Sequence, residues 1–307
     1  MSSESTGIIP HRSWLIAHGS GLGPRASNLT PHRSLLAPRA SRLEPLYSIF
    51  YPMPLDSAKH LVGLVSPHVL SAAEADPISP VVMDLQACDM LEIRYDWFEK
   101  GSWASLSARV RSIAPNSEQI GTVRLVRDGG TFPDDSVAER PALWASIFAA
   151  AEVPEWMDLE RDCLHDYGDL DELAKPRGTR IIVSEHNFVR IPTLLELKKL
   201  AQDAQRVKAA GLKIAAMSNG ATDCQRLYQF ASKNAKNFEM FAAFGMGESG
   251  KPSRIWSLHE GANLTYGSIE VGAAPGQIDV VTMRKALDTF DNFNSENDIL
   301  AFLNKFE

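Results

Sequence analysis

A lysine lies in the middle of a short apolar run, in the stretch GLKIAAM over residues 211–217. An ammonium group is costly to bury alone, so such a lysine must reach water, pair with a buried carboxylate or perform chemistry. In a desolvated site near other cations it loses its proton more easily, and the free amine can form an imine with a ketone or aldehyde. Lys213 is therefore a candidate nucleophile, and a structural pairing with a carboxylate is the alternative.

A histidine stands at the end of another apolar run, in RIIVSEH over residues 180–186. Imidazole changes its charge near neutral pH, so His186 could be the general acid and base that imine chemistry needs. A purely structural histidine is the alternative reading.

Further polar side chains lie in or just after the second half of similar runs. They comprise Glu92, Arg94, Asp96, Arg124, Asp158, Glu160, Arg254 and Gln277. Such residues occur at seven of eight runs, and solvated strand ends alone would not favour one end of the strands. Arginines and a glutamine are suited to the carboxylate and hydroxyls of a small anionic substrate.

Secondary-structure elements must bring these residues together, and eight apolar runs in the sequence predict strands that could do so. The runs cover residues 60–66, 90–96, 120–124, 156–160, 180–186, 212–217, 238–245 and 264–271. They recur about 20 to 35 residues apart, which is typical of repeated βαβ units, and near-continuous apolar runs suit parallel strands buried on both faces.

The segments between the runs show helical patterns, clearest over residues 140–151, 194–210, 222–234 and 281–290. Thr193 and Glu196 have the spacing of a capping box, and Gly211 is the predicted stop of that helix. Eight strand–helix units in residues 59–307 predict an α/β fold of the (β/α)8 TIM-barrel type, whose active sites lie at the carboxyl ends of the strands. A doubly wound open sheet is the alternative.

Composition excludes several classes of protein. The chain has a net charge of −7 and a pI near 5.7, which argues against a nucleic-acid binder but allows an anionic small molecule in a local basic pocket. No uncharged apolar run is long enough to span a membrane. The three scattered cysteines, without a CxxC pair, predict free thiols in a reducing compartment and no structural zinc. We expect a cytoplasmic protein, and a homodimer is left open.

The first 58 residues differ from the rest of the chain. Five arginines and no acidic residue occur between Glu4 and Glu44, in a Ser-, Pro- and Gly-rich context. This composition predicts a disordered extension. An organelle transit peptide is the alternative, although three prolines interrupt the amphipathic helix that it would need.

Two local motifs point to cofactors but lack the required context. FGMGESG has GxGxxG spacing, yet it follows the seventh run rather than the first and leads directly into Lys251–Pro252, so a mobile loop is favoured over a dinucleotide site. Cys163, His165 and Asp166 have no accompanying second ligand cluster, so no metal site is predicted.

Taken together, the chain resembles type I 3-dehydroquinate dehydratases, the Schiff-base 3-dehydroquinases of the shikimate pathway, over about residues 60 to 290. The motifs, in chain order, are MLEIRYD with Glu92 and Arg94, TVRLVRDGGTFPDD with Arg124 and Asp128, MDLE, IIVSEHNF with His186, LKIAAM with Lys213, MGESGKPSRI with Arg254, and AAPGQI with Gln277. Seven motifs in the family's order make the resemblance specific.

Four positions depart from the family pattern. Asp128 stands where many members have a glutamate that backs the histidine, and Gly63 aligns with a substrate-contacting serine, with Ser66 as a substitute if the register differs. Phe244 replaces a methionine and Ala273 replaces a serine.

The resemblance implies a hydro-lyase that needs no metal or organic cofactor. Lys213 would form the imine, His186 would be the acid and base, and Asp128 would support it. The substrate 3-dehydroquinate would be bound by Glu92, Arg94, Arg124, Arg254 and Gln277. Two alternatives are a class I aldolase or dehydratase for a related polyol acid, and a non-catalytic regulator, which would have no reason to keep the lysine and histidine.

Overall fold

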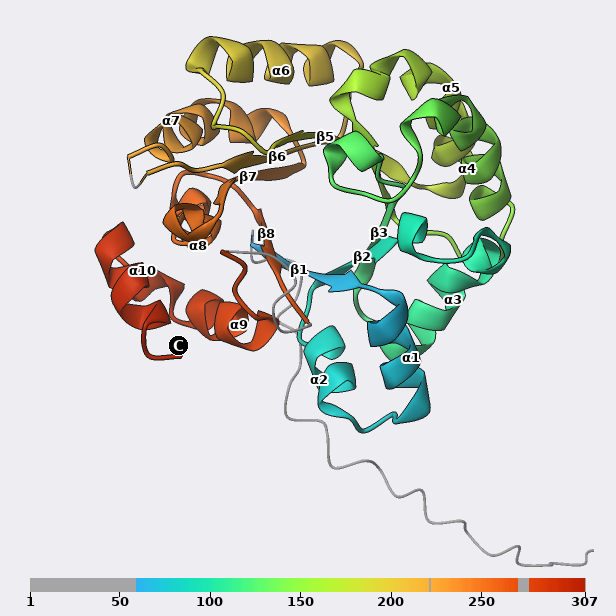
Figure 1. Ribbon diagram of the computed structural model, residues 1–307, viewed down its shortest axis with the longest axis horizontal. Coiled ribbons are helices and arrows are strands. Elements are labelled where there is room, and N and C mark those ends of the chain that lie inside the picture. Colours follow the sequence, from blue (N-terminus) through green and yellow to red (C-terminus); the bar gives the residue numbers. More distant parts are fainter. Residues whose placement is uncertain (1–58, 221, 270–275, 307) are drawn as a thin grey trace, which may run out of the picture. The chain divides into compact units, whose positions relative to one another are not determined.

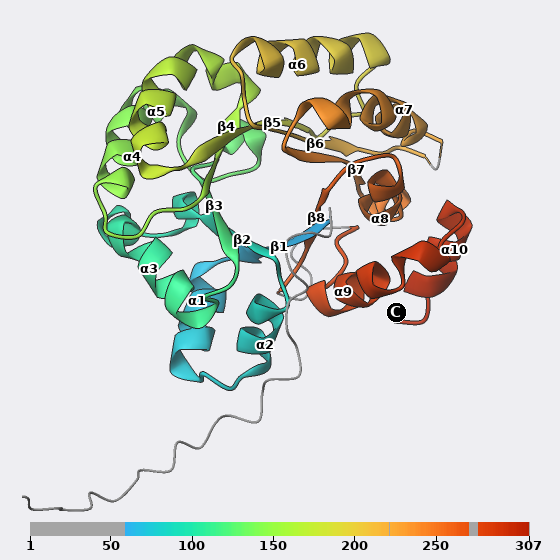
Figure 2. The ribbon, with the colours of Figure 1, turned by 180° about the vertical axis from the view of Figure 1, so that it is seen from behind.

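Eight parallel strands form the centre of the fold, in a computed structural model that describes residues 59–220, 222–269 and 276–306. The strands are β1 (His60–Val65), β2 (Met90–Arg94), β3 (Glu118–Thr122), β4 (Trp156–Glu160), β5 (Arg180–Asn187), β6 (Gly211–Met217), β7 (Met240–Met246) and β8 (Leu264–Gly267). They are arranged as one sheet in the order β7-β6-β5-β4-β3-β2-β1-β8. Figures 1 and 2 show the strands as an inner ring with the helices outside it, so the fold is the predicted (β/α)8 TIM barrel, nearly closed.

The two strands at the ends of this order, β7 and β8, have no ladder pairs with each other among the described residues. Asn263, which directly precedes β8, bridges this seam with its side chain and its backbone. At the amino end of the seam Asn263 Oδ1 accepts a hydrogen bond from Phe241 N (2.7 Å), and Asn263 N donates to Phe241 O (3.0 Å). Nearer the carboxyl end, Thr265 Oγ1 of β8 donates to Arg254 O (2.6 Å), in the helix Ser253–His259 that follows β7. Of the β7 groups that a ladder would satisfy, the N–H and C=O of Phe241 are thus satisfied by Asn263.

Ten helices lie outside the strands in the described part of the chain. They are α1 (Pro67–Ala75), α2 (Pro80–Gln86), α3 (Trp103–Ile113), α4 (Arg140–Phe148), α5 (Tyr167–Ala174), α6 (Leu194–Arg206), α7 (Gln225–Asn234), α8 (Ser253–His259), α9 (Val280–Asp288) and α10 (Glu296–Leu303). No helix of residues 59–220, 222–269 and 276–306 is long and apolar enough to cross a membrane.

The predicted start of α6 is confirmed and its predicted end is wrong. Thr193 and Glu196 form both hydrogen bonds of a capping box. The helix ends earlier than Gly211, because Val207 is its C-cap and Lys208 takes a left-handed conformation with φ 61°. Gly211 begins β6 instead, where an added Cβ would come within 2.8 Å of Ile182 Cγ1.

Two apolar clusters follow from the alternation of side chains along the strands. The larger one fills the layer between the strands and the helices. The smaller one lies inside the barrel and comprises Val62, Met90, Ile120, Trp156, Ile182, Ala215, Met240, Ala242, Phe244, Leu264 and Tyr266. Residues two positions away from these along each strand therefore also face the lumen.

Residues 1–58, for which an extension or a transit peptide is predicted, lie outside the described residues. The boundary between residues 58 and 59 therefore remains a prediction from composition.

Candidate active site

Lys213 lies inside the barrel, and its ammonium group contacts two carboxylates. Its Nζ is 2.9 Å from Glu92 Oε2 and 3.3 Å from Asp158 Oδ2, and all three side chains are buried. The Tyr266 ring lies on another side of the nitrogen, with its centroid 4.3 Å away. The carboxylate pairing weighed from the sequence is therefore present, and the chemistry depends on what surrounds the pair.

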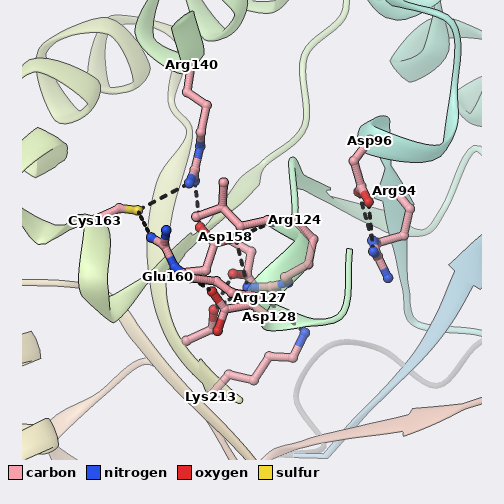
Figure 3. A network of polar contacts seen from close by, with 12 residues as sticks. Arg94, Asp96, Arg124, Arg127, Asp128, Arg140, Asp158, Glu160, Cys163 and Lys213 are labelled. Carbon is pink, nitrogen blue, oxygen red and sulfur yellow. Dashed lines mark hydrogen bonds and ion pairs between the residues drawn. The ribbon is translucent and has the colours of Figure 1, made fainter. Parts of the chain in front are cut away.

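A chain of alternating charges continues from Asp158 towards α4. Arg124 Nη2 is 2.8 Å from Asp158 Oδ2 and its Nη1 is 3.4 Å from Glu160 Oε1, while Arg140 Nη2 donates to Glu160 Oε2 at 2.6 Å. Ser184 Oγ donates to Asp158 Oδ1 (2.5 Å) and accepts from Arg124 Nη1 (2.8 Å). Figure 3 shows Arg124 in the middle of this network, with Arg140 reaching it from the helix layer. Charges buried in such a chain hold one another in fixed positions.

The network keeps Asp158 ionised. Burial raises the pKa of its carboxyl, but the positive charges of Arg124 and Lys213 outweigh burial and hold that pKa below its usual range. Asp158 is therefore a fixed counter-ion for the lysine and does not exchange protons near neutral pH.

His186 lies on β5, two residues beyond Ser184, which pairs in register with Lys213. Burial, and then the positive charges of Arg124 and Lys213, lower the pKa of His186 well below its ordinary value, with Asp158 partly opposing. Its Nδ1 is buried and has no hydrogen-bond partner among the described residues. The imidazole is thus neutral near pH 7 and is available as a base.

Asp128 ends the short 3-10 helix Val126–Asp128 that follows β3. Burial, and then the charge of Glu160, raise the pKa of its carboxyl to about 6, with Arg124 and Arg127 opposing. Its ion pair is with Arg127, at 3.7 Å, and in residues 59–220, 222–269 and 276–306 no hydrogen bond joins Asp128 to a histidine. Its support of His186 therefore stays a prediction.

Arg254 is a buried cation without a carboxylate partner among the described residues. It lies at the start of α8, donates from Nε to Gly276 O (2.9 Å), and its guanidinium lies over the Phe244 ring at 4.5 Å. Burial lowers the pKa of Arg254 to about 10. Gln277 follows Gly276, and its Oε1 is buried without a hydrogen-bond partner. A buried cation without a carboxylate partner is suited to an anionic ligand, and the unpaired Oε1 of Gln277 is suited to a hydroxyl donor.

The turn between β7 and α8 is held to the segment before Gln277. Glu248 Oε1 accepts a hydrogen bond from Gly276 N at 2.9 Å, on the opposite side of Gly276 from Arg254. Gly276 has φ 74°, and an added Cβ would lie 2.2 Å from Gly247 O. The GxGxxG segment is thus a close-packed turn, and the mobility predicted for it from the sequence stays a prediction.

Arg94 is set to one side of the main network, as Figure 3 shows. It forms two hydrogen bonds to Asp96, at 3.0 and 2.9 Å, and its guanidinium lies 4.0 Å above the Trp97 ring. The predicted substrate-binding residues therefore form separate groups: Glu92 and Arg124 with Lys213, Arg254 near Gln277, and Arg94 with its own carboxylate.

Of the positions that depart from the family pattern, Gly63 faces away from the lumen. An added Cβ would lie 2.7 Å from Cys88 Sγ, in the helix layer, and the inward position on that strand belongs to Leu64. Ser66 caps α1 by accepting from Val69 N. Phe244 lies in the lumen as aligned, and Ala273 falls outside the described residues.

Sequence reasoning did not assign a role to four residues of the network: Asp158, Glu160, Ser184 and Tyr266. Their signal was the alternation along the strands, since Asp158 follows Trp156 by two residues and Ser184 precedes His186 by two. Arg140 had no such signal, because it comes from a helix.

No group of three or more His, Cys, Asp or Glu side chains in the described residues is arranged to hold a metal ion. Cys163, weighed above as a metal ligand, instead accepts from Arg140 Nη1 (3.3 Å) and Arg127 Nη2 (3.7 Å).

Comparisons with known proteins identify the family. The family model described as type I 3-dehydroquinase matches residues 69–294. A 3-dehydroquinate dehydratase of Methanosarcina barkeri is 28% identical over 66% of this chain and 86% of the relative, and one of Pyrococcus abyssi is 29% identical over 69% and 94%.

A solved structure agrees in fold. The 3-dehydroquinate dehydratase from Geobacillus kaustophilus superposes with a TM-score of 0.66 at 21% identity, covering 77% of this chain and 93% of that one. The chain belongs to the type I 3-dehydroquinase family, as its motifs predicted.

Proposed function

We propose that this chain converts 3-dehydroquinate to 3-dehydroshikimate through an imine on Lys213. The observation that carries the proposal is a buried lysine with two carboxylates at its nitrogen and a neutral histidine on the neighbouring strand. The names of the curated relatives support the substrate.

The imine forms in three steps. The Lys213 ammonium first gives a proton to neutral His186, and the free amine adds to the C3 ketone of the substrate. The resulting carbinolamine then takes a proton from His186 onto its oxygen and loses water. The product is a protonated imine, whose positive charge lies where the ammonium was, so Glu92 and Asp158 keep their partner.

The iminium makes the dehydration possible, because it withdraws electrons from C2. His186 removes the C2 proton and the electron pair passes to the imine nitrogen, giving an enamine. The enamine then expels the C1 hydroxyl, which leaves as water with the proton of His186. Hydrolysis of the remaining iminium releases 3-dehydroshikimate and restores Lys213, so atoms and charge balance without a cofactor.

The anionic end of the substrate would bind at Arg254 and Gln277, which have no charged protein partner of their own in the described residues. Glu92, Arg94 and Arg124 would meet the ring hydroxyls. We assign Asp128 to supporting His186 on the strength of the motif, and its contact with Arg127 must then be exchanged for one with the histidine.

Borohydride reduction tests the proposal. Treating the protein with borohydride and 3-dehydroquinate should add one ligand mass and abolish activity, and the Lys213→Arg variant should gain no mass. Lys198→Arg, at an exposed position on α6, is the control that keeps both effects. An adduct on another lysine, or an active enzyme that forms none, would contradict the mechanism.

The second candidate is a class I aldolase or dehydratase acting on a related polyol acid. It rests on the departures from the family pattern, of which Phe244 lies in the lumen. Formation of a conjugated enone, followed by ultraviolet absorption with 3-dehydroquinate as substrate, separates the candidates. Trapping without enone formation would favour the second.

A further inference from the structure

Tyr266 presents its ring to the nitrogen of Lys213. It lies on β8, pairs in register with Val62 of β1, and its side chain is part of the apolar cluster inside the barrel. The centroid of its ring is 4.3 Å from Lys213 Nζ, and its ring is tilted by 49° against Phe244, with centroids 5.8 Å apart. The ammonium thus has carboxylates on one side and an aromatic face on another.

The hydroxyl of Tyr266 is buried, and the acceptor within its reach is the Glu92 carboxylate, although the geometry falls short of a full hydrogen bond. Burial, and then the nearby charges of Glu92 and Asp158, raise its pKa well above the ordinary value. Tyr266 therefore keeps its proton in the working range of pH. A buried hydroxyl whose hydrogen bond is incomplete costs free energy, and an incoming ligand oxygen in better alignment than Glu92 would recover it.

We propose that Tyr266 is a positioning residue for the imine on Lys213, an inference that rests on the proposed function. The face of an aromatic ring carries negative potential and attracts a cation within about 6 Å of its centroid. The ammonium and the iminium both place a positive charge at this nitrogen, whereas the carbinolamine between them is neutral there. The ring therefore favours loss of water from the carbinolamine, which we take as the step that limits kcat because the later enamine is also neutral at this nitrogen. The ring also holds the iminium in place, while the hydroxyl donates to an oxygen of the bound ligand.

A space-filling role alone predicts something different. A phenylalanine or another apolar side chain would pack against Phe244 equally well, and the electronic character of the ring would not matter. The two accounts can therefore be separated by changing the ring's charge distribution while keeping its shape.

The test compares Tyr266→Phe, Tyr266→Leu and a series with fluorinated phenylalanines at position 266, measuring kcat and KM for 3-dehydroquinate and the yield of borohydride adduct. Tyr266→Phe should raise KM about fivefold with kcat nearly unchanged. Tyr266→Leu should lower kcat about thirtyfold, equivalent to about 2 kcal/mol at about 1.36 kcal/mol per tenfold. Relative to the Phe variant, log kcat should fall steadily with the number of fluorines, because fluorine weakens the negative face.

Tyr167→Leu is the matched control, because Tyr167 is a buried tyrosine on α5 outside the lumen. It should lower the unfolding temperature without changing kcat. A flat fluorine series, or an unchanged kcat in Tyr266→Leu with normal adduct in the wild type, would overturn the role of Tyr266 alone. A wild type that forms no adduct would refute the proposed function and, with it, this role.

Discussion

Removing the positive charge of Arg254 should stabilise the protein and impair its use of substrate. Burial lowers the pKa of Arg254 from 12.5 to about 10, which corresponds to about 3 kcal/mol against the charged form in the fold. Both values lie above pH 8, so the side chain stays charged and the cost is present in full from pH 5 to 8. We therefore expect no pH dependence of this cost in that window.

The Arg254→Met variant also loses favourable contacts. The hydrogen bond to Gly276 O contributes about 1 kcal/mol, and the guanidinium above Phe244 contributes about 1 kcal/mol. The difference predicts a variant that is about 1 kcal/mol more stable than the wild type without ligand. Urea unfolding at pH 7 measures this change directly.

The matched control is Arg94→Met. Arg94 has its own buried carboxylate, since Asp96 is fully buried and accepts two hydrogen bonds from it. Removing Arg94 leaves the Asp96 charge without its cation and with Thr131 as its remaining donor, which costs about 3 kcal/mol. Substitution by methionine should thus raise the free energy of unfolding at Arg254 and lower it at Arg94.

The kinetic arm of the experiment measures KM. Loss of a buried partner for the substrate carboxylate should cost at least about 2 kcal/mol, or about thirtyfold in KM. If Arg254→Met were as destabilising as Arg94→Met, or if its KM were unchanged, the assignment of Arg254 as the binding partner of the substrate carboxylate would be refuted.

Three further predictions concern the charges around the lumen. Lys213→Met should lower the free energy of unfolding by about 3–5 kcal/mol, because Glu92 and Asp158 lose their shared cation, whereas Lys213→Arg should lose less. Because the pKa of Asp128 is raised in the fold, the wild type should lose stability as pH rises from about 4 to about 6. In thermal unfolding, Asp128→Asn should therefore be more stable than the wild type at pH 7 and equally stable at pH 4. The reverse trend would contradict the assignment. Glu248→Ala should raise KM about tenfold with little change in kcat, since the N–H of Gly276 loses its acceptor, while Glu248→Gln, which keeps an acceptor oxygen, should resemble the wild type.

The sequence predicted the strands well because each buried parallel strand is a local pattern of apolar residues. Alternation along a strand puts Lys213, Ala215 and Met217 on one face, but by itself it cannot decide whether that face is the lumen or the helix layer. The family motifs added which of the polar residues belong together. What the runs could not predict was contact across the barrel, such as Lys213 with Glu92, which are 121 residues apart.

Two errors have a common physical origin in backbone geometry. The orientation of Gly63 depends on strand register, where a shift of one residue turns a side chain to the opposite face. The end of α6 depends on Lys208 adopting a left-handed conformation, which sequence patterns assign to glycine. The contact of Asp128 with Arg127 similarly depends on a short 3-10 turn, which the pattern of apolar residues does not predict.

A ligand in the site would also connect the two strands, β7 and β8, that form no ladder with each other in the described part of the chain. Arg254 follows β7 and Gln277 follows β8, so a molecule that contacts both bridges the two ends of the strand order. Such a ligand would link β7 to β8, and part of its binding free energy would stabilise the two strands against local opening. Amide protons of the two strands should then exchange with solvent more slowly when the ligand is bound.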